Sequence, residues 1–186
     1  MSKKFVGFWN VSVILTYIEL CIAVGSICAA ADGKIWYAVV GLALCGVCDM
    51  FDGKIARATK RTKDAEVCGI QIDSLCDLVS FGVLPSAIGH AMGIAGAAMG
   101  VLMFYTLCAV IRLGYFNVTE QKRQEETSEN RTSFEGLPVT WSAVIVPLVS
   151  LLRLANESIM PWVMGVVLFI VGFCFIARIR VKKPQI

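Results

Sequence analysis

Six long runs of apolar residues follow one another along this chain, and short polar segments separate them. Each run approaches the ~20 residues that an α-helix needs to cross about 30 Å of hydrocarbon. The pattern therefore predicts an all-α, polytopic membrane protein, built as one bundle of six transmembrane helices. The predicted spans are residues 8–30, 35–51, 70–92, 94–115, 137–155 and 159–177.

The composition supports a membrane protein. Hydrophobic residues make up 57% of the chain and the mean hydropathy is +0.72, unlike a typical soluble domain. The 186 residues suffice for six spans and leave no room for a second soluble domain, so we expect residues 1–186 to form a single domain. The net charge of +3 is modest, and nothing in the chain indicates binding to nucleic acid.

The basic residues predict the orientation in the membrane. With six spans, 15 of the 17 Lys and Arg residues fall on one side, and only Lys34 and Arg153 fall on the other. Cytoplasmic loops carry the excess of basic residues. We therefore expect an integral protein of the cytoplasmic membrane with both termini on the cytoplasmic side.

Four aspartates are the most informative polar residues. Asp49 and Asp52 are spaced i,i+3 near the end of the second run, and Asp73 and Asp77 are spaced i,i+4 near the start of the third. Each pair shares one helix face, and both pairs lie at a similar depth near the cytoplasmic boundary if these spans pack together. An acid in a membrane helix costs roughly 2.5–3.5 kcal/mol. Opposed pairs of carboxylates indicate a cytoplasmic site for one or two hard divalent cations.

Interhelical ion pairing is the alternative explanation of these acids. Lys54, Arg57 and Arg112 are the candidate partners. One or two such cations against four carboxylates would leave negative charge buried, which is strongly unfavourable. We therefore favour bound metal.

Small residues accompany the acids. Gly53 and Ala56 lie beside the acids of the second run, and Gly69 lies one turn before those of the third. The missing side chains would let a bulky ligand approach the backbone, and the Arg57 guanidinium is suited to gripping a phosphate. Together with metal, this set favours a diphosphate substrate. Tight helix packing is the alternative reason for the small residues.

Residues 49–57 read D-x-x-D-G-x-x-A-R, and residues 69–77 read G-x-x-x-D-x-x-x-D. These stretches resemble the signature of the CDP-alcohol phosphotransferase family, which also has a six-span layout. Eleven residues separate Arg57 from Gly69, more than is usual in the family. We expect the extra residues to lie in a polar loop between the spans.

Three further segments resemble the branch of the family that uses serine as acceptor, the CDP-diacylglycerol–serine O-phosphatidyltransferases. Tyr115 stands where that branch has a second Arg, so the role of that Arg is not carried over. The segments are D-S-L-C-D-L-V-S-F-G-V-L-P at 73–85, R-L-G-Y-F-N at 112–117 and F-E-G-L-P at 134–138.

The resemblance implies a metal-dependent enzyme of phospholipid synthesis. CDP-diacylglycerol would enter from the membrane lipid and L-serine from the cytoplasm. The serine hydroxyl would attack with Asp77 as its base, CMP would leave, and phosphatidylserine would form. A homodimer is the family expectation. Two divalent ions, Mg²⁺ or Mn²⁺, would be held by Asp49, Asp52, Asp73 and Asp77. The nucleotide and diphosphate would contact Asp49, Asp52, Gly53, Ala56, Arg57 and Gly69.

Three residues outside the signature carry separate expectations. Arg112, near the cytoplasmic end of the fourth span, is our candidate for binding the serine carboxylate, and the alternative is a side chain that snorkels toward lipid phosphate. Glu19 lies in the middle of the first span and should face the bundle interior. Pro85 should kink the third span.

Two rival functions stay open. The acceptor could be another alcohol, such as glycerol phosphate or inositol phosphate, and the lipid could carry acyl or ether-linked chains. The protein could instead be a divalent-cation transporter that uses the four acids as its pathway. Against a transporter, no internal repeat is visible and the acids crowd one end rather than the midplane.

Overall fold

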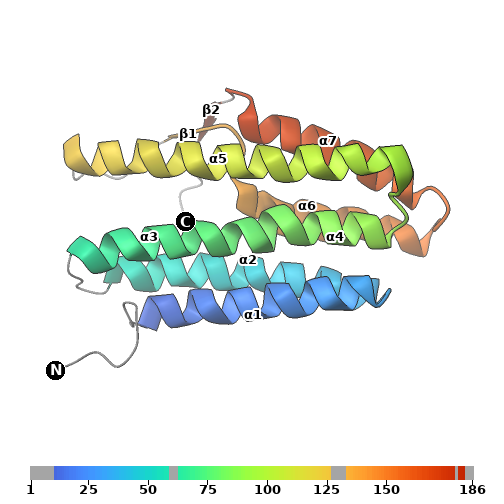
Figure 1. Ribbon diagram of the computed structural model, residues 1–186, viewed down its shortest axis with the longest axis horizontal. Helices are drawn as coiled ribbons and strands as arrows, with labels where there is room; N and C mark the ends of the chain where they lie inside the picture. The colour runs from blue at the N-terminus through green and yellow to red at the C-terminus, as the bar shows by residue number, and fades with distance from the viewer. Residues whose placement is uncertain (1–10, 59–62, 127–132, 179, 183–186) are drawn as a thin grey trace.

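In the computed structural model, helical rods lie side by side with their long axes nearly parallel (Figure 1). The structure describes residues 11–58, 63–126, 133–178 and 180–182. The first rods are α1 (Val11–Ala31), α2 (Ile35–Ala58) and a composite of α3 (Lys63–Asp77), η1 (Leu78–Val83) and α4 (Leu84–Ala91). The later rods are α5 (Met99–Glu126) preceded by η2 (Gly96–Ala98), α6 (Ser142–Ser150) flanked by η3 (Val139–Trp141) and η4 (Leu151–Leu154), and α7 (Met160–Ile176).

Four of the rods are long and apolar enough to cross a membrane, which confirms a helical membrane protein. These stretches are Val13–Ala31, Ile35–Gly53, Ala65–Ala91 and Gly96–Thr119. The last two rods, Val139–Leu154 and Met160–Ile176, are apolar but shorter. A departure from the all-helical expectation is a small antiparallel ribbon of β1 (Ser133–Glu135) and β2 (Arg180–Lys182).

The helices that carry the acids continue beyond the apolar runs. α2 ends at Ala58 and α3 begins at Lys63, so the expectation of a long polar loop between these spans is wrong for residues 63–68. Lys, Glu and Ala are good helix formers, and a helix that is already nucleated extends at little cost. Both acid pairs consequently lie inside continuous helix.

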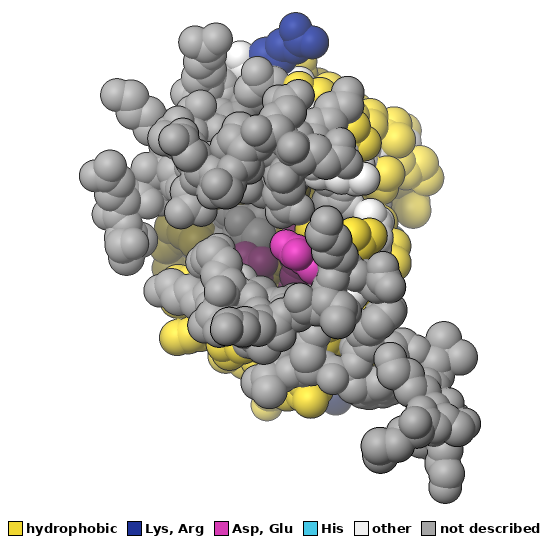
Figure 2. All heavy atoms as spheres, turned by 90° about the vertical axis from the view of Figure 1, so that its left-hand side faces the viewer, with side chains coloured by type: hydrophobic (Ala, Val, Ile, Leu, Met, Phe, Trp, Pro, Cys, Tyr) yellow, Lys and Arg dark blue, Asp and Glu magenta, His cyan; other side chains and the backbone are white. Residues whose placement is uncertain are grey.

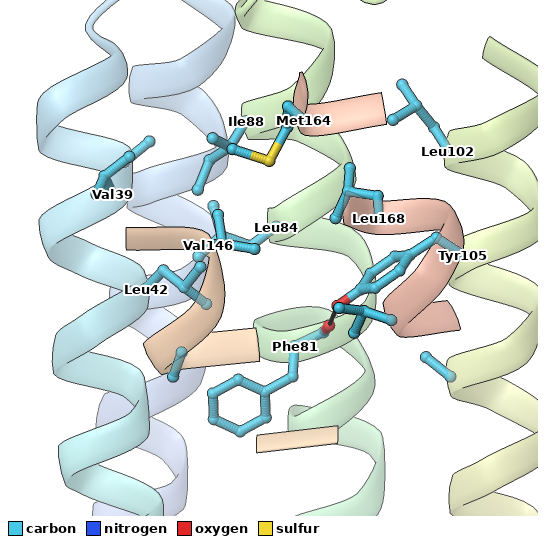
Figure 3. Close-up of a cluster of buried hydrophobic side chains, with 14 of the residues drawn as sticks. Val39, Leu42, Phe81, Leu84, Ile88, Leu102, Tyr105, Val146, Met164 and Leu168 are labelled. Atoms are coloured by element: carbon cyan, nitrogen blue, oxygen red, sulfur yellow. Dashed lines mark hydrogen bonds between the residues drawn. The ribbon is translucent and has the colours of Figure 1, made fainter. Parts of the chain in front are cut away.

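The hydrophobic core lies between α2, α4, α5, α6 and α7 (Figure 3). Leu42, Leu84 and Leu168 are among its fully buried side chains, and Phe81 and Tyr105 are its largest aromatic residues. The ring of Tyr105 packs on Phe175 of α7, with their centroids 5.4 Å apart. This core fixes the middle of the bundle and leaves the ends free for other chemistry.

Pro85 is accompanied by a change of helix type rather than a simple bend. The six residues of η1 form a π-helix directly after Asp77, and the N–H of Leu84 donates to the carbonyl of Val79 five residues earlier. Such π segments are rare and often mark functional sites. The third rod therefore changes register just beyond its last acid.

The packing of α2 against α6 is a test of the fold. A Cβ built on Gly46 of α2 would lie 2.6 Å from Cβ of Ala143 on α6, closer than two carbons can approach. We expect Gly46→Ala to destabilise the protein by about 1–3 kcal/mol. Thermal unfolding of the detergent-purified protein measures the loss.

The swap Gly46→Ala/Ala143→Gly serves as the compensating variant and should recover most of the lost stability. Gly25→Ala is the matched control, because its Cβ meets nothing within 4 Å and alanine is the better helix former. Equal melting temperatures for Gly46→Ala and Gly25→Ala would contradict the packing described here.

Candidate active site and metal centre

Acidic side chains from α2 and α3 meet across a gap between these helices. α1 packs against both α2 and α3, while the acids span the space between the latter two. Asp49, Asp52 and Asp73 each offer a carboxylate oxygen, and these three atoms all lie within 4.8 Å of one another. Asp52 is 4% exposed. The fold thus brings together three of the four predicted ligands as a compact cluster.

The dimensions and chemistry of the cluster fit a hard divalent cation. Mg²⁺ binds oxygen at about 2.0–2.1 Å, so two ligands on opposite sides of one ion are roughly 4.2 Å apart. Carboxylate oxygens are the ligands that Mg²⁺ and Mn²⁺ prefer. Small side-chain movements would allow all three oxygens to share an ion.

Asp77 follows Asp73 by one turn of α3 and is not one of this group of three. Its side chain is nearly buried, with 8% exposure, and its Oδ1 atom has no hydrogen-bond partner among the residues that the structure describes. Asp77 lines the same cavity as Asp49 and Asp73. A buried carboxylate oxygen without a partner is costly, so this atom is available to a ligand that enters the cavity.

The cavity has a volume of about 250 Å³. Asp49, Asp73 and Asp77 form one wall, and the opposite wall comes from α5 and from the start of the α6 rod. Figure 2 shows acidic side chains within a hollow at the end of the bundle where α3 begins. The opposite wall comprises Arg112, Leu113, Phe116, Pro138, Val139 and Thr140.

Arg112 is buried and held in one orientation. Its Nε donates to the carbonyl of Leu137 at 3.1 Å and its Nη2 to the carbonyl of Gly136 at 3.5 Å. Its guanidinium carbon lies 5.9 Å from the centre of the Phe116 ring, a cation–π arrangement. Arg112 lines the same cavity as Asp49, Asp73 and Asp77. A side chain that snorkels to lipid is inconsistent with this burial.

The F-E-G-L-P segment (residues 134–138), which we call the platform, carries the two carbonyls to which Arg112 donates. Gly136 has φ +79°, and a Cβ there would lie 2.8 Å from the carbonyl oxygen of Phe175. The backbone N–H of Leu137 donates to the carbonyl oxygen of Cys174 in α7 at 3.1 Å. Glycine is required at this point because of both the backbone conformation and the close approach of α7.

A second link ties α3 to α5 beside the acids. The Ser74 hydroxyl donates to Oδ1 of Asn117 at 2.8 Å. Ser74 neighbours Asp73, and Asn117 ends the R-L-G-Y-F-N segment. Two sequence segments that resemble the serine-using branch therefore contact each other directly.

The remaining predicted residues lie on the acid-bearing helices, on the outer side of the aspartates along the chain. Gly53 of α2 and Gly69 of α3 are half-buried. Ala56 and Arg57 belong to the last turn of α2, and their side chains lie outside the described part of the structure.

Sequence reasoning missed Thr16 of α1. Its hydroxyl donates to Oδ2 of Asp52 at 3.1 Å, and it is buried. One turn further along α1, Glu19 is fully buried, and within the described part of the chain neither of its carboxylate oxygens has a hydrogen-bond partner. Glu19 therefore faces the interior as expected. The signal for Thr16 was available, because Thr16 and Glu19 share one face of an otherwise apolar helix.

The fold and the site define a class of protein: a polytopic membrane protein with a cluster of carboxylates at one end of its helical bundle. The sequence profile of the CDP-alcohol phosphatidyltransferase family matches residues 9–177. The chain belongs to this family, which confirms the resemblance drawn from the two aspartate motifs.

Individual relatives carry related names. The chain is 40% identical over 106 residues to the CDP-diacylglycerol–serine O-phosphatidyltransferase of Saccharomyces cerevisiae. This alignment covers 55% of the chain and 37% of the relative. The chain is 36% identical over 122 residues to the protein of the same name from Helicobacter pylori, covering 63% and 45%. Archaetidylserine synthase of Methanothermobacter thermautotrophicus is 29% identical over 147 residues, covering 78% and 59%. The alignments thus span 37% to 59% of these relatives' lengths.

Thr16 offers a test of the metal centre. Removal of its hydroxyl in Thr16→Val frees the Asp52 carboxylate to rotate, and groups that orient a metal ligand are typically worth about 10–100-fold in metal affinity. We expect weaker Mn²⁺ binding by at least about tenfold, with little loss of stability. Titration of the purified protein with Mn²⁺, followed by electron paramagnetic resonance of the free ion, measures the affinity.

Thr16→Ser keeps the hydroxyl and should retain most of the affinity. Indistinguishable Mn²⁺ affinities for Thr16→Val and the wild type would show that the Thr16 bond does not orient a metal ligand.

Proposed function

We propose that this protein transfers the phosphatidyl group of CDP-diacylglycerol to the hydroxyl of L-serine, forming phosphatidylserine and CMP. The observation that supports it most is the cavity that Asp49, Asp73 and Asp77 line together with the buried Arg112. An acidic wall suits metal and diphosphate, and a fixed guanidinium across from it suits a small anionic acceptor. The names of the relatives and the serine-branch segments favour serine as that acceptor.

The four aspartates hold two divalent ions, Mg²⁺ or Mn²⁺, in this proposal. When bound, the ions neutralise the diphosphate and polarise the phosphorus next to the diacylglycerol. Asp52 keeps its orientation through the bond from Thr16. Gly53, Ala56, Arg57 and Gly69 line the cytidine and diphosphate site, where Arg57 pairs with phosphate.

Asp77 takes the proton of the serine hydroxyl. The serine oxygen forms a new bond to phosphorus, the bond from that phosphorus to the oxygen bridging to CMP breaks, and CMP leaves with the bridging oxygen. The unpartnered Oδ1 of Asp77 in the cavity wall is the atom placed to receive the proton.

Arg112 binds the serine carboxylate. Two of its N–H groups are already used on the carbonyls of Gly136 and Leu137, which fixes the plane of the guanidinium. A guanidinium is a planar donor with five N–H groups, which matches the shape of a carboxylate. A pre-oriented donor binds a carboxylate at lower entropic cost than a flexible one.

The same proposal includes the setting of the enzyme. All six rods cross the cytoplasmic membrane, the two short ones included, and residues 1–186 act as a single domain. Both termini and the active site face the cytoplasm, in agreement with the 15 to 2 distribution of basic residues and the positive-inside rule. The working form is a homodimer.

Release of CMP is the direct test. Purified protein with CDP-diacylglycerol, L-serine and Mg²⁺ or Mn²⁺ should release CMP, and a chelator should stop it. Asp77→Asn should reduce the rate by at least about 10²-fold, because a general base typically contributes 10²–10⁴-fold. Asp32→Asn is the control, since Asp32 lies in the turn before α2, far along the chain from the acid pairs, and its Oδ2 is 3.8 Å from Nζ of Lys34.

Other outcomes would select a rival. Release only with glycerol phosphate or inositol phosphate would replace serine as the acceptor. Metal flux into liposomes without any CMP release would favour a transporter. Parallel assays with ether-linked CDP-archaeol would settle the lipid.

The role of Arg112 has a separate test. Arg112→Lys keeps the charge but loses the planar fork. We expect KM for serine to rise by about tenfold or more, since a charge-assisted hydrogen bond is worth about 1.5–3 kcal/mol. KM for CDP-diacylglycerol should change little. Steady-state kinetics measure both KM values, and Arg153→Lys, at the opposite end of the bundle, is the control. An unchanged KM for serine would contradict the binding of serine by Arg112.

A further inference from the structure

The π-helical segment after Asp77 contains two backbone carbonyls that accept hydrogen bonds from side chains. In an α-helix the carbonyl of Phe81 would accept from the amide of residue 85, but that residue is Pro85, which has no N–H. The carbonyl of Gly82 lies next to it in η1. A buried carbonyl left without a donor is costly in a membrane interior, so the Phe81 carbonyl needs another partner.

Hydroxyl groups from three elements supply these partners. Tyr105 of α5 donates to the carbonyl of Phe81 at 2.7 Å, and Ser142 of α6 approaches the same oxygen at 3.4 Å. Thr106 of α5 donates to the carbonyl of Gly82 at 3.1 Å, and Ser86 of α4 does so at 3.3 Å. We call Tyr105, Thr106, Ser86 and Ser142 the hydroxyl clamp.

Tyr105 makes the shortest bond to the π segment, and Figure 3 shows that bond within the hydrophobic core. Tyr105 is completely buried, and its ring is fixed against Phe175. α5 also approaches η1 closely, because a Cβ on Gly82 would lie 3.2 Å from Cβ of Ala109. The hydroxyl is therefore held by rigid surroundings at a fixed distance from the Phe81 carbonyl.

The π segment sets the direction of Asp77 relative to the core. α4 is anchored by Leu84 and Ile88 in the core, and Asp77 immediately precedes η1. Successive residues of an α-helix are rotated by about 100°. Relaxation of η1 to α-helical register would therefore change the direction of the Asp77 carboxylate relative to α4, away from its place in the cavity wall.

We propose that Tyr105 is a positioning residue: through the Phe81 carbonyl it holds the π segment, and the π segment holds Asp77 in its reactive orientation. The role of Asp77 rests on the proposed function above. Tyr105 touches neither substrate nor metal in this proposal. Its effect should therefore appear in turnover and not in the binding of serine, which the proposal assigns to Arg112.

Tyr105→Phe is the test, because it keeps the ring and its packing and removes only the hydroxyl. We expect kcat for CMP release to fall by about tenfold or more, while KM for serine stays within about twofold of wild type. Hydrogen–deuterium exchange of the peptide covering residues 78–86 should become faster. Ser150→Ala is the matched control: it removes a buried hydroxyl that donates to the carbonyl of Val146 at 2.7 Å, far from the cavity, and both readouts should stay at wild-type values.

The two readouts separate the possible failures. Unchanged exchange in Tyr105→Phe would overturn the clamp, whatever reaction the protein catalyses. Faster exchange with unchanged kcat, or a raised KM for serine with unchanged kcat, would overturn the positioning of Asp77. A wild-type protein that releases no CMP with serine would instead contradict the proposed function, and the exchange result would still decide the clamp.

Discussion

The mutual repulsion of closely spaced carboxylates in an apolar bundle is the constraint on which the rest of this structure depends. Asp49, Asp52 and Asp73 hold oxygens within 4.8 Å of one another, an arrangement that is unfavourable unless cations enter between them. The fold accommodates this by packing α1 against both acid-bearing helices and leaving their facing sides to the acids. In the proposed function, the gap between α2 and α3 is therefore the part of the bundle where a cation and a diphosphate would contribute stability as well as chemistry.

Much of the fold follows from hydrophobicity alone. The starts of α1, α2, α6 and α7 lie within a few residues of the predicted spans, because an apolar run in a membrane has few alternatives to helix. The helix ends outside the membrane were less predictable. α2, α3 and α5 continue into polar sequence, where helix propensity and neighbouring loops decide the boundary and the hydrophobic pattern carries no information.

The two walls of the cavity differ in how far sequence could predict them. The acidic wall is a local pattern: spacing places each pair on one face, and depth aligns the pairs. The opposite wall depends on contacts between distant segments, since Arg112 reaches the carbonyls of Gly136 and Leu137. The need for glycine at 136 arises from the approach of α7. Spacing and hydrophobicity along one sequence do not predict which distant segments come into contact. Only the resemblance to a family indicated that these segments matter.

Hydroxyl side chains within the spans hold backbone and carboxylate groups near the acids in fixed orientations. In the hydrocarbon region a serine, threonine or tyrosine needs a partner, and the available partners are carbonyls or carboxylates. Thr16 finds the Asp52 carboxylate and Tyr105 finds a carbonyl that Pro85 leaves without its usual donor. Thr16 thus holds a carboxylate of the acidic cluster, and Tyr105 replaces a backbone hydrogen bond that Pro85 removes. An interior proline followed along the chain by buried hydroxyls thus predicts where a membrane helix departs from regular geometry, and here that departure lies next to Asp77, the aspartate that we propose as the base.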